Sequence, residues 1–358
     1  MKSLLKYEIR KMLANRLAVV AVAAVLLLSA FLSLYTFQNM YAFDGKSSDG
    51  SGSAAVEIDK AIAEKYAGFL TNEKVRQMMS DFKPTSDLHG MNAKYLYQNA
   101  SQSAVFARFS DINGNWNGLS VSDVFGNEAI KIGYVKGWIA TSQNLAKVLL
   151  FLSIVIILLI APVFAGEYGG VEHIILTSRY GKTKCAAAKA AASMIAAISI
   201  TILAVSFHLL TARILYGTEG LDCSILFAPT EFIEGYIPFN ITCGTVLKYQ
   251  VLLSMMSAVS ITGITLILSS VCKNQMLAFI ASAAIYMMPV MLPISETSPL
   301  YRLVVLMPLY DSQAISIMSV EQMENGMLYA VWSVPAAFLL LLIGAMAGPR
   351  IFAKHQVS

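Results

Sequence analysis

The sequence predicts an all-α integral membrane protein with six transmembrane helices and a small, mainly helical extracytoplasmic domain between the first two. Three observations lead to this class. Of the 358 residues, 56% are hydrophobic and only 13% are charged, whereas about a quarter of the residues of a soluble domain are charged. The mean hydropathy is +0.62. The apolar residues also gather in runs long enough for a bilayer, which requires about 20 residues.

Six stretches with almost no Asp, Glu, Lys or Arg define the predicted spans. Their boundaries are 17–43, 145–166, 186–212, 249–272, 274–295 and 326–349. The first could instead be a cleaved signal peptide. Its basic leader, 1–16, is long and no small-residue cleavage site follows it, which favours a retained helix. Pro289 and Pro293 crowd the end of the fifth stretch, so we expect that span to bend or re-enter there.

The placement of Lys and Arg predicts the orientation. With the N-terminus inside, the segments 1–16, 167–189, 273 and 350–358 hold 12 of the 26 basic residues and only three of the 22 acids. Short loops rich in Lys and Arg stay in the cytoplasm. We therefore expect a multi-pass plasma-membrane protein with both termini cytoplasmic, the tail being 350–358. The net charge of +4 reflects this topology, and no basic stripe typical of a nucleic-acid partner is present.

The N-terminal leader is expected to be helical. Leu5, Ile9 and Met12 fall on one face of a helix over 1–16, with lysines largely off that face. This pattern predicts an interfacial helix in the inner headgroup layer whose lysines reach anionic lipids of the bilayer. The alternative is an ordinary positively charged flank that happens to be helical.

The extracytoplasmic domain is predicted to cover 44–138. Its first part should form two helices separated near Gly68, with Thr71 or Asn72 capping the second helix. The remainder is rich in loops. The domain is large enough to bind a ligand or a partner, but it contains no catalytic constellation and no metal-ligand spacing.

Two further outer loops are predicted. The loop 213–247 contains Cys223 and Cys243, which could form a disulfide worth about 3 kcal/mol. Both cysteines could equally stay reduced. The loop 296–324 includes an apolar but short stretch, 303–315, interrupted by Pro308, which favours a re-entrant helix over a seventh span.

The loop 167–185 between the second and third spans contains Gly181-Lys182-Thr183, the triplet that ends a phosphate-binding P-loop. The full motif needs a glycine five residues earlier, and that position is Leu176. A P-loop also needs a strand feeding a helix N-terminus, whereas this loop lies between two membrane spans. The triplet is therefore not a nucleotide site, and no catalytic, cofactor or metal residue is predicted in this chain.

The same loop resembles the coupling loop of the ABC-2 type exporter permeases. The resemblance lies in Glu167-Tyr168, a turn glycine, a short apolar helix and a basic stretch before an Ala-rich span. The basic leader and the stretch KYAGFLTNEKV are similar to Firmicutes members of that family, which suggests a Gram-positive bacterium. One departure is that Gly170 stands about one residue closer to the glutamate than is usual. In that family this loop docks on a separate nucleotide-binding subunit, so the resemblance implies ATPase-contacting roles for Glu167, Gly170, Ile174, Arg179 and Lys182.

The expected function is therefore that of a transmembrane permease subunit of an ABC exporter, and not of an enzyme. ATP would be bound by a partner ATPase, and a second permease copy or paralogue would complete the path for a peptide, lipid-like or drug-like substrate. In the fourth span, Ser254, Thr262 and Thr265 recur at helical spacing, which favours close helix packing over a lining of that path. The competing hypothesis is a membrane sensor or scaffold whose outer domain binds a ligand or partner.

Overall fold

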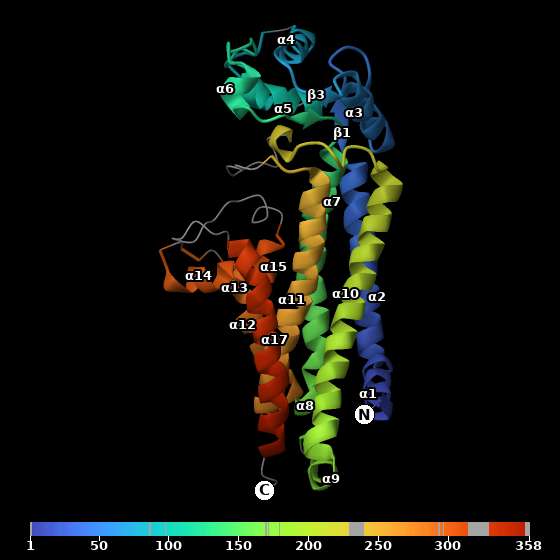
Figure 1. Ribbon diagram of the computed structural model, residues 1–358. Coiled ribbons are helices and arrows are strands. Elements are labelled where there is room, and N and C mark those ends of the chain that lie inside the picture. The colour runs from blue at the N-terminus through green and yellow to red at the C-terminus, as the bar shows by residue number, and fades with distance from the viewer. Residues whose placement is uncertain are drawn as a thin grey trace.

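The computed structural model shows a long bundle of helices with a smaller head at one end (Figure 1). It describes residues 2–85, 87–96, 98–168, 170, 172–178, 180–228, 240–292, 294–295, 297–313 and 329–354. Within these ranges, five helices are long and apolar enough to cross a membrane. They are α2 (Arg16–Gln38), α7 continued by α8 (Lys136–Ala165), η2 continued by α10 (Gly181–Tyr216), α11 (Cys243–Val271) and most of α17 (Val331–Lys354). The chain therefore has the helices of a multi-pass, all-α membrane protein.

The predicted fifth span, 274–295, is not one long helix. α12 (Gln275–Tyr286) ends three residues before Pro289, and α13 (Met288–Met291) is a single turn. At 1.5 Å per residue α12 is about 18 Å long, shorter than the hydrocarbon layer of about 30 Å. α14 (Pro299–Val305) and α15 (Pro308–Asp311) follow, and Figure 1 shows α13 and α14 beside the bundle, below the upper ends of α7, α10 and α11. The expected bend is present, and the apolar stretch around Pro308 forms these short helices.

The other spans differ from the predicted ones at their ends. α2 ends at Gln38, because β1 (Tyr41–Phe43) takes the last three residues of the stretch 17–43. The second span begins at Lys136 instead of 145, α10 continues to Tyr216 instead of 212, and α11 begins at 243 instead of 249. α17 (Tyr329–Lys354) runs five residues past the predicted end. Counting charges finds the apolar centre of each helix, whereas α7, α10, α11 and α17 each continue into polar residues at one end.

The head, residues 39–135, contains the two predicted helices and one that was not predicted. α3 (Ser53–Lys65) and α4 (Asn72–Asp81) are separated at Gly68, and the Thr71 hydroxyl accepts a hydrogen bond from the Lys74 amide at 3.3 Å, the predicted cap. α5 (Ala100–Phe109) lies in the part that we expected to be loop-rich, and Phe106 and Phe109 are buried in the head. The remaining short elements are η1 (Ala93–Tyr95), α6 (Val121–Phe125) and two antiparallel pairs, β1 with β2 (Asp49–Ser51) and β3 (Gly68–Phe69) with β4 (Lys131–Ile132).

The head is fastened to the loop between α10 and α11. The guanidinium group of Arg108 donates hydrogen bonds to the carbonyls of Leu226 (2.5 Å) and Ala228 (3.2 Å), in and after η3 (Ile225–Phe227). Charge-assisted hydrogen bonds of this kind are stronger than neutral ones. The head and this loop therefore form one body above the bundle.

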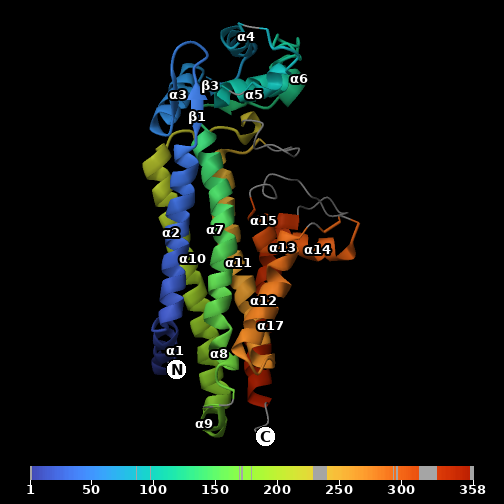
Figure 2. The ribbon, with the colours of Figure 1, turned by 180° about the vertical axis from the view of Figure 1, so that it is seen from behind.

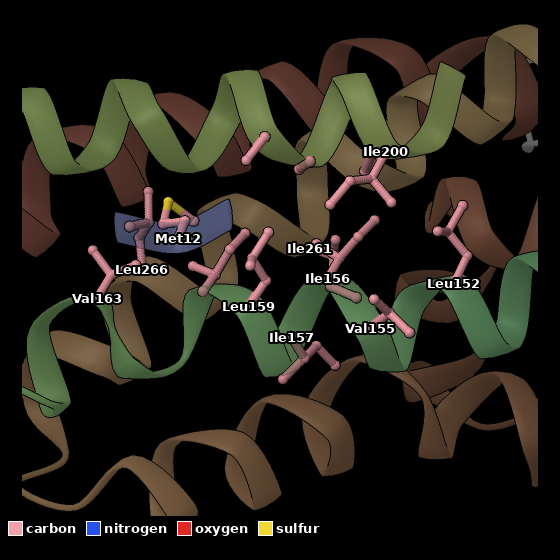
Figure 3. Packing of buried hydrophobic residues seen from close by; sticks show 14 of the residues in the cluster. Met12, Leu152, Val155, Ile156, Ile157, Leu159, Val163, Ile200, Ile261 and Leu266 are labelled. Atoms are coloured by element: carbon pink, nitrogen blue, oxygen red, sulfur yellow. The ribbon is translucent and has the colours of Figure 1, made fainter. Parts of the chain in front are cut away.

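The bundle core is apolar and closely packed. Figure 3 shows side chains of α7, α10 and α11 converging, with Met12 of the N-terminal helix α1 (Lys2–Leu13) beside them. Ser254, Thr262 and Thr265 of α11 are at most 1% exposed, as a helix-packing face requires. α11 also meets α17 backbone to backbone, since a Cβ atom on Gly344 would lie 2.2 Å from the Gly263 carbonyl oxygen. Small residues therefore let these two helices approach without side chains between them.

Both described ends of the chain lie at the same end of the bundle. In Figures 1 and 2, α1 and the last turns of α17 are at the end opposite the head, together with α8, α9 and the start of α10. This end is termed the tail end below. Five complete crossings alone would place the two termini at opposite ends of the bundle. The termini lie at the same end because the short, bent segment from α12 to α15 brings the chain back toward the head before α17.

Candidate functional site

The candidate site is the connection between the second and third spans at the tail end. It consists of α8 (Pro162–Ala165), the described residues up to Gly170, α9 (Glu172–Thr177) and the π-helical turn η2 (Gly181–Cys185). α9 lies at the extreme tip of the tail end in both ribbon views. The loop is thus a small structure built on the ends of two long helices.

Glu167, which we predicted as an ATPase contact, is buried. Its side chain is 2% exposed, and its Oε1 atom accepts from the Nζ atoms of Lys11 and Lys189, each at 2.6 Å. Lys11 comes from α1 and Lys189 from α10. Glu167 therefore joins three elements inside the protein, and its carboxylate does not lie on the surface.

The electrostatics keep Glu167 ionised. Burial raises the pKa of this carboxyl group. The hydrogen bonds and positive charges of Lys11 and Lys189 together lower it by more, so the pKa lies below its ordinary value of 4.5. Burial likewise lowers the pKa of Lys11, but its hydrogen bond to Glu167 and the negative charges of Glu167 and Glu8 together raise it by more, so the pKa lies above its ordinary value. Both groups are therefore charged at neutral pH.

Glu8 completes a four-residue ionic cluster. Its carboxylate lies 3.2 Å from Nζ of Lys189, and the two side chains are 9% and 2% exposed. The positive charges of the two lysines equal the negative charges of the two glutamates, and buried charges need such pairing. The sequence analysis missed Glu8 and Lys189, although two signals were available: Glu8 is the one acid in the basic leader, and Lys189 interrupts an otherwise apolar span, where a charge marks an interior partner.

Pro162 breaks the second span just before this cluster. Proline lacks an amide hydrogen and obstructs the preceding turn, so α7 stops and α8 begins at Pro162. The Ser269 hydroxyl of α11 fills the gap. It accepts from the amides of Phe164 (2.9 Å) and Ala165 (3.1 Å) and donates to the Ala161 carbonyl (2.7 Å). A side chain from one span thus supplies hydrogen bonds that the broken helix of another lacks.

Tyr168 fastens the other side of the same segment. Its hydroxyl donates to the Ser270 carbonyl at 2.6 Å, and its ring lies 5.6 Å from that of Phe352 in α17. Residues 162–168 are therefore held by the ionic cluster toward α1 and α10, and by uncharged contacts toward α11 and α17.

The two described glycines of the loop differ from their predicted roles. Among the described residues, a Cβ atom on Gly170 would have only the Glu167 carbonyl oxygen within 4 Å, at 3.8 Å, and Gly170 does not have a left-handed backbone conformation. A Cβ atom on Gly181 would lie 1.6 Å from the Ile175 carbonyl oxygen of α9. The glycine that the turn requires is therefore Gly181, the first residue of the GKT triplet, because only there does the backbone pass directly against α9.

α9 presents an apolar side chain at the tip. Leu176 is buried and Ile175 packs partly against the bundle core, whereas Ile174 is 71% exposed. Lys182 is exposed as well, and Arg179 lies outside the described residues. Of the five predicted contact residues, Ile174 and Lys182 therefore have side chains on the surface, Gly170 lies in a turn with open space around it, and Glu167 is interior.

Cys223 and Cys243 lie at the opposite end, under the head. Both are buried free thiols, and the Cys243 amide donates to the Cys223 carbonyl at 3.0 Å. Burial raises the pKa of the Cys223 thiol to about 11, so this thiol is protonated and unreactive. The two residues are neighbours as a disulfide would need, but they are not bonded in the structure.

No match to this chain is found among protein-family models, curated proteins or solved structures. Within the described ranges, no three His, Cys, Asp or Glu residues are grouped to hold a metal ion. Functional inference therefore rests on the geometry of the tail end and on the sequence resemblance.

Proposed function

We propose that this chain is the membrane permease subunit of an ABC exporter of the ABC-2 type. In this proposal a separate ATPase subunit binds and hydrolyses ATP, and the loop around α9 receives its movement. Two permease chains, identical or related, enclose a path through which a peptide, lipid-like or drug-like substrate moves outward.

The observation that carries the proposal is the construction of the tail-end loop. An apolar side chain of the short helix α9, Ile174, is 71% exposed, and α9 lies beyond the ends of the other helices in Figure 1. The segment immediately before it is fastened to four other helices through Glu167, Tyr168 and Ser269. In this proposal the partner binds α9, and the segment before α9 is bonded to several membrane helices. Movement of the partner can therefore be transferred to those helices.

The proposed orientation places the tail end in the cytoplasm and the head outside. The leader and the segment 167–189 hold nine Lys and Arg residues, namely Lys2, Lys6, Arg10, Lys11, Arg16, Arg179, Lys182, Lys184 and Lys189. Short segments with such an excess remain cytoplasmic, where an ATPase has access to ATP. The proposed location is the plasma membrane of a Gram-positive bacterium.

A sensor or scaffold remains the second candidate because of one feature of the head. An open hollow of about 250 Å³ lies between two head loops, and it is lined by Leu88, Met91 and Ile112 together with the polar residues Asp87 and Asn113. A hollow of this kind offers room for a small ligand. In this alternative no ATPase binds the tail end.

Co-purification with the ATPase encoded beside this gene tests the proposal. We expect the ATPase to remain bound to the tagged chain, and Ile174→Asp to abolish that association because it places a charge in an apolar contact. The matched control is Met276→Asp, which changes an equally apolar side chain that is 63% exposed at the start of α12. Loss of association in both variants, or in neither, would argue against docking on α9, and the absence of any bound ATPase would favour the sensor.

A further inference from the structure

The exposed face of α1 carries a row of basic side chains. Lys2, Lys6 and Arg10 follow one another at intervals of four residues, so they project from the same side of the helix, and all three are exposed. None of them makes an ion pair or a side-chain hydrogen bond with another described residue. The row is therefore available to an external anion.

No negative charge interrupts this face. Glu8 is the only acid in residues 2–16, and it is 7% exposed and paired with Lys189. The apolar residues Leu5, Ile9 and Met12, which we expected to face lipid, pack against the bundle core instead. α1 thus turns most of its apolar side chains and its acid inward, and the only charges on its outward surface are basic.

The position of α1 identifies the source of the anion. Only two residues separate α1 from α2, the first of the helices long enough to cross a membrane, which begins at Arg16 with Asn15 as its cap. α1 is therefore held where the bilayer surface begins. Tyr7 and Leu13, which are 64% and 53% exposed, add an aromatic and an apolar group suited to the boundary between headgroups and acyl chains.

We propose that the outward row of α1 binds the headgroups of anionic phospholipids, and that this binding steadies the loop around α9. The second part follows from the inward side of the same helix, where Lys11 and Glu8 contact Glu167 and Lys189. α1 is consequently a connection between the lipid surface and the end of the second span. Lipid binding does not depend on the exporter function proposed above, whereas any effect on transport rests on it.

Lipid titration tests the binding step. The chain in neutral detergent is titrated with short-chain phosphatidylglycerol, and bound lipid is counted by native mass spectrometry. Each basic residue near an anionic surface contributes about a fivefold change in affinity, so Lys6→Gln/Arg10→Gln should weaken binding by at least about fivefold. The matched control, Lys273→Gln/Lys354→Gln, removes the same charge from other exposed tail-end positions and should bind as the unmodified chain does.

Three results would overturn the binding step. They are unchanged affinity in the α1 variant, equal binding of phosphatidylcholine, and competition by glycerol 3-phosphate or by an acidic peptide at the same concentration. Success of glycerol 3-phosphate would indicate a site for a free phosphate, and success of the peptide would indicate a protein partner.

Proteolysis of the loop tests the second step without any ATPase. In nanodiscs, phosphatidylglycerol should slow trypsin cleavage after the exposed residues Lys182 and Lys184 several-fold relative to pure phosphatidylcholine. Glu8→Gln/Lys11→Gln, which cuts both links of α1, to Lys189 and to Glu167, but leaves the outward row intact, should keep lipid binding and lose this protection. Equal protection in that variant would show that α1 does not transmit the effect.

Discussion

At the scale of single residues, Gly170 and Gly181 illustrate how differently two glycines of one loop are constrained. The sequence pattern drew attention to Gly170, because it stands where a related loop would turn. The structure leaves space beside Gly170, whereas the backbone of α9 occupies the position of any side chain at residue 181. A contact between two backbone segments does not depend on the identity of the neighbouring side chains. The sequence therefore could not show that Gly181 is closely packed and Gly170 is not.

Gly181→Ala should lower the free energy of unfolding by about 2–3 kcal/mol, because the Ile175 carbonyl must move to admit the methyl group. Gly170→Ala should change it by less than about 0.5 kcal/mol. Reversible unfolding in mixed micelles measures both values. A larger loss at Gly170 than at Gly181 would contradict the described turn.

Lys189 is the cation on which the ionic cluster depends most. It contacts both Glu8 and Glu167 and is 2% exposed, so Lys189→Met leaves two buried carboxylates with one partially exposed lysine. We expect a loss of about 3–5 kcal/mol, the usual effect of breaking a buried ion pair. Lys147→Met, which removes an exposed lysine of α7, is the control and should be neutral in the same unfolding measurement.

Glu167 also predicts a pH dependence. Its pKa in the folded protein lies below the ordinary 4.5, so its contribution to stability is complete above about 4.5 and disappears as the pH falls through the lower folded value. The thermal midpoint of the unmodified chain should therefore fall below pH 4.5 more steeply than that of Glu167→Gln. Parallel curves for the two chains would show that Glu167 is not ionised in the fold.

At the scale of elements, the break in the second span depends on a residue of another helix. Pro162 alone indicates a kink in this span and nothing about what stabilises it. The Ser269 hydroxyl supplies three hydrogen bonds across the break, and it belongs to the same small-residue stripe of α11 as Ser254. Nothing in the spacing of that stripe distinguishes a serine that bonds its own helix from one that bonds a neighbour.

Ser269→Ala should therefore cost about 2 kcal/mol, since it leaves two buried amides and one carbonyl without a partner. Ser254→Ala is the matched change on the same helix. The Ser254 hydroxyl donates only to the Gln250 carbonyl, at 2.7 Å, and its removal should cost less than about 0.5 kcal/mol. Amide hydrogen exchange at Phe164 and Ala165 should accelerate in the first variant alone, and equal exchange in both would exclude the bridge.

At the scale of the whole molecule, the apolar runs predicted the membrane class and most of the long helices. The helix ends and the break in the fifth span were harder to predict from the sequence. Uncharged polar residues such as Asn144 are buried between helices, and a count of charged residues does not show which polar residues belong to a span. Of the candidate site, the sequence located the loop and the residue Glu167. Its burial could not be predicted, because one of its two lysines lies 156 positions away.

The orientation makes a prediction for the complete chain. In a background with the four cysteines replaced, Ser122→Cys in the head should react with a membrane-impermeant maleimide in intact cells. Thr177→Cys at the end of α9 should react only after the cells are permeabilised. Labelling is measured by a mass shift, and the reverse pattern would place α9 outside, where no cytoplasmic ATPase could reach it.

The backbone contact between Gly263 and Gly344 has a consequence for how motion spreads through the bundle. Flexible side chains between two helices can change conformation and so absorb part of a displacement. Between Gly263 and Gly344 there are no side chains, and the two backbones are in direct contact. We therefore expect α11 and α17 to behave as one rigid unit. Because α8 is hydrogen-bonded to α11 through Ser269, we expect a displacement of the second span to move α11 and α17 together.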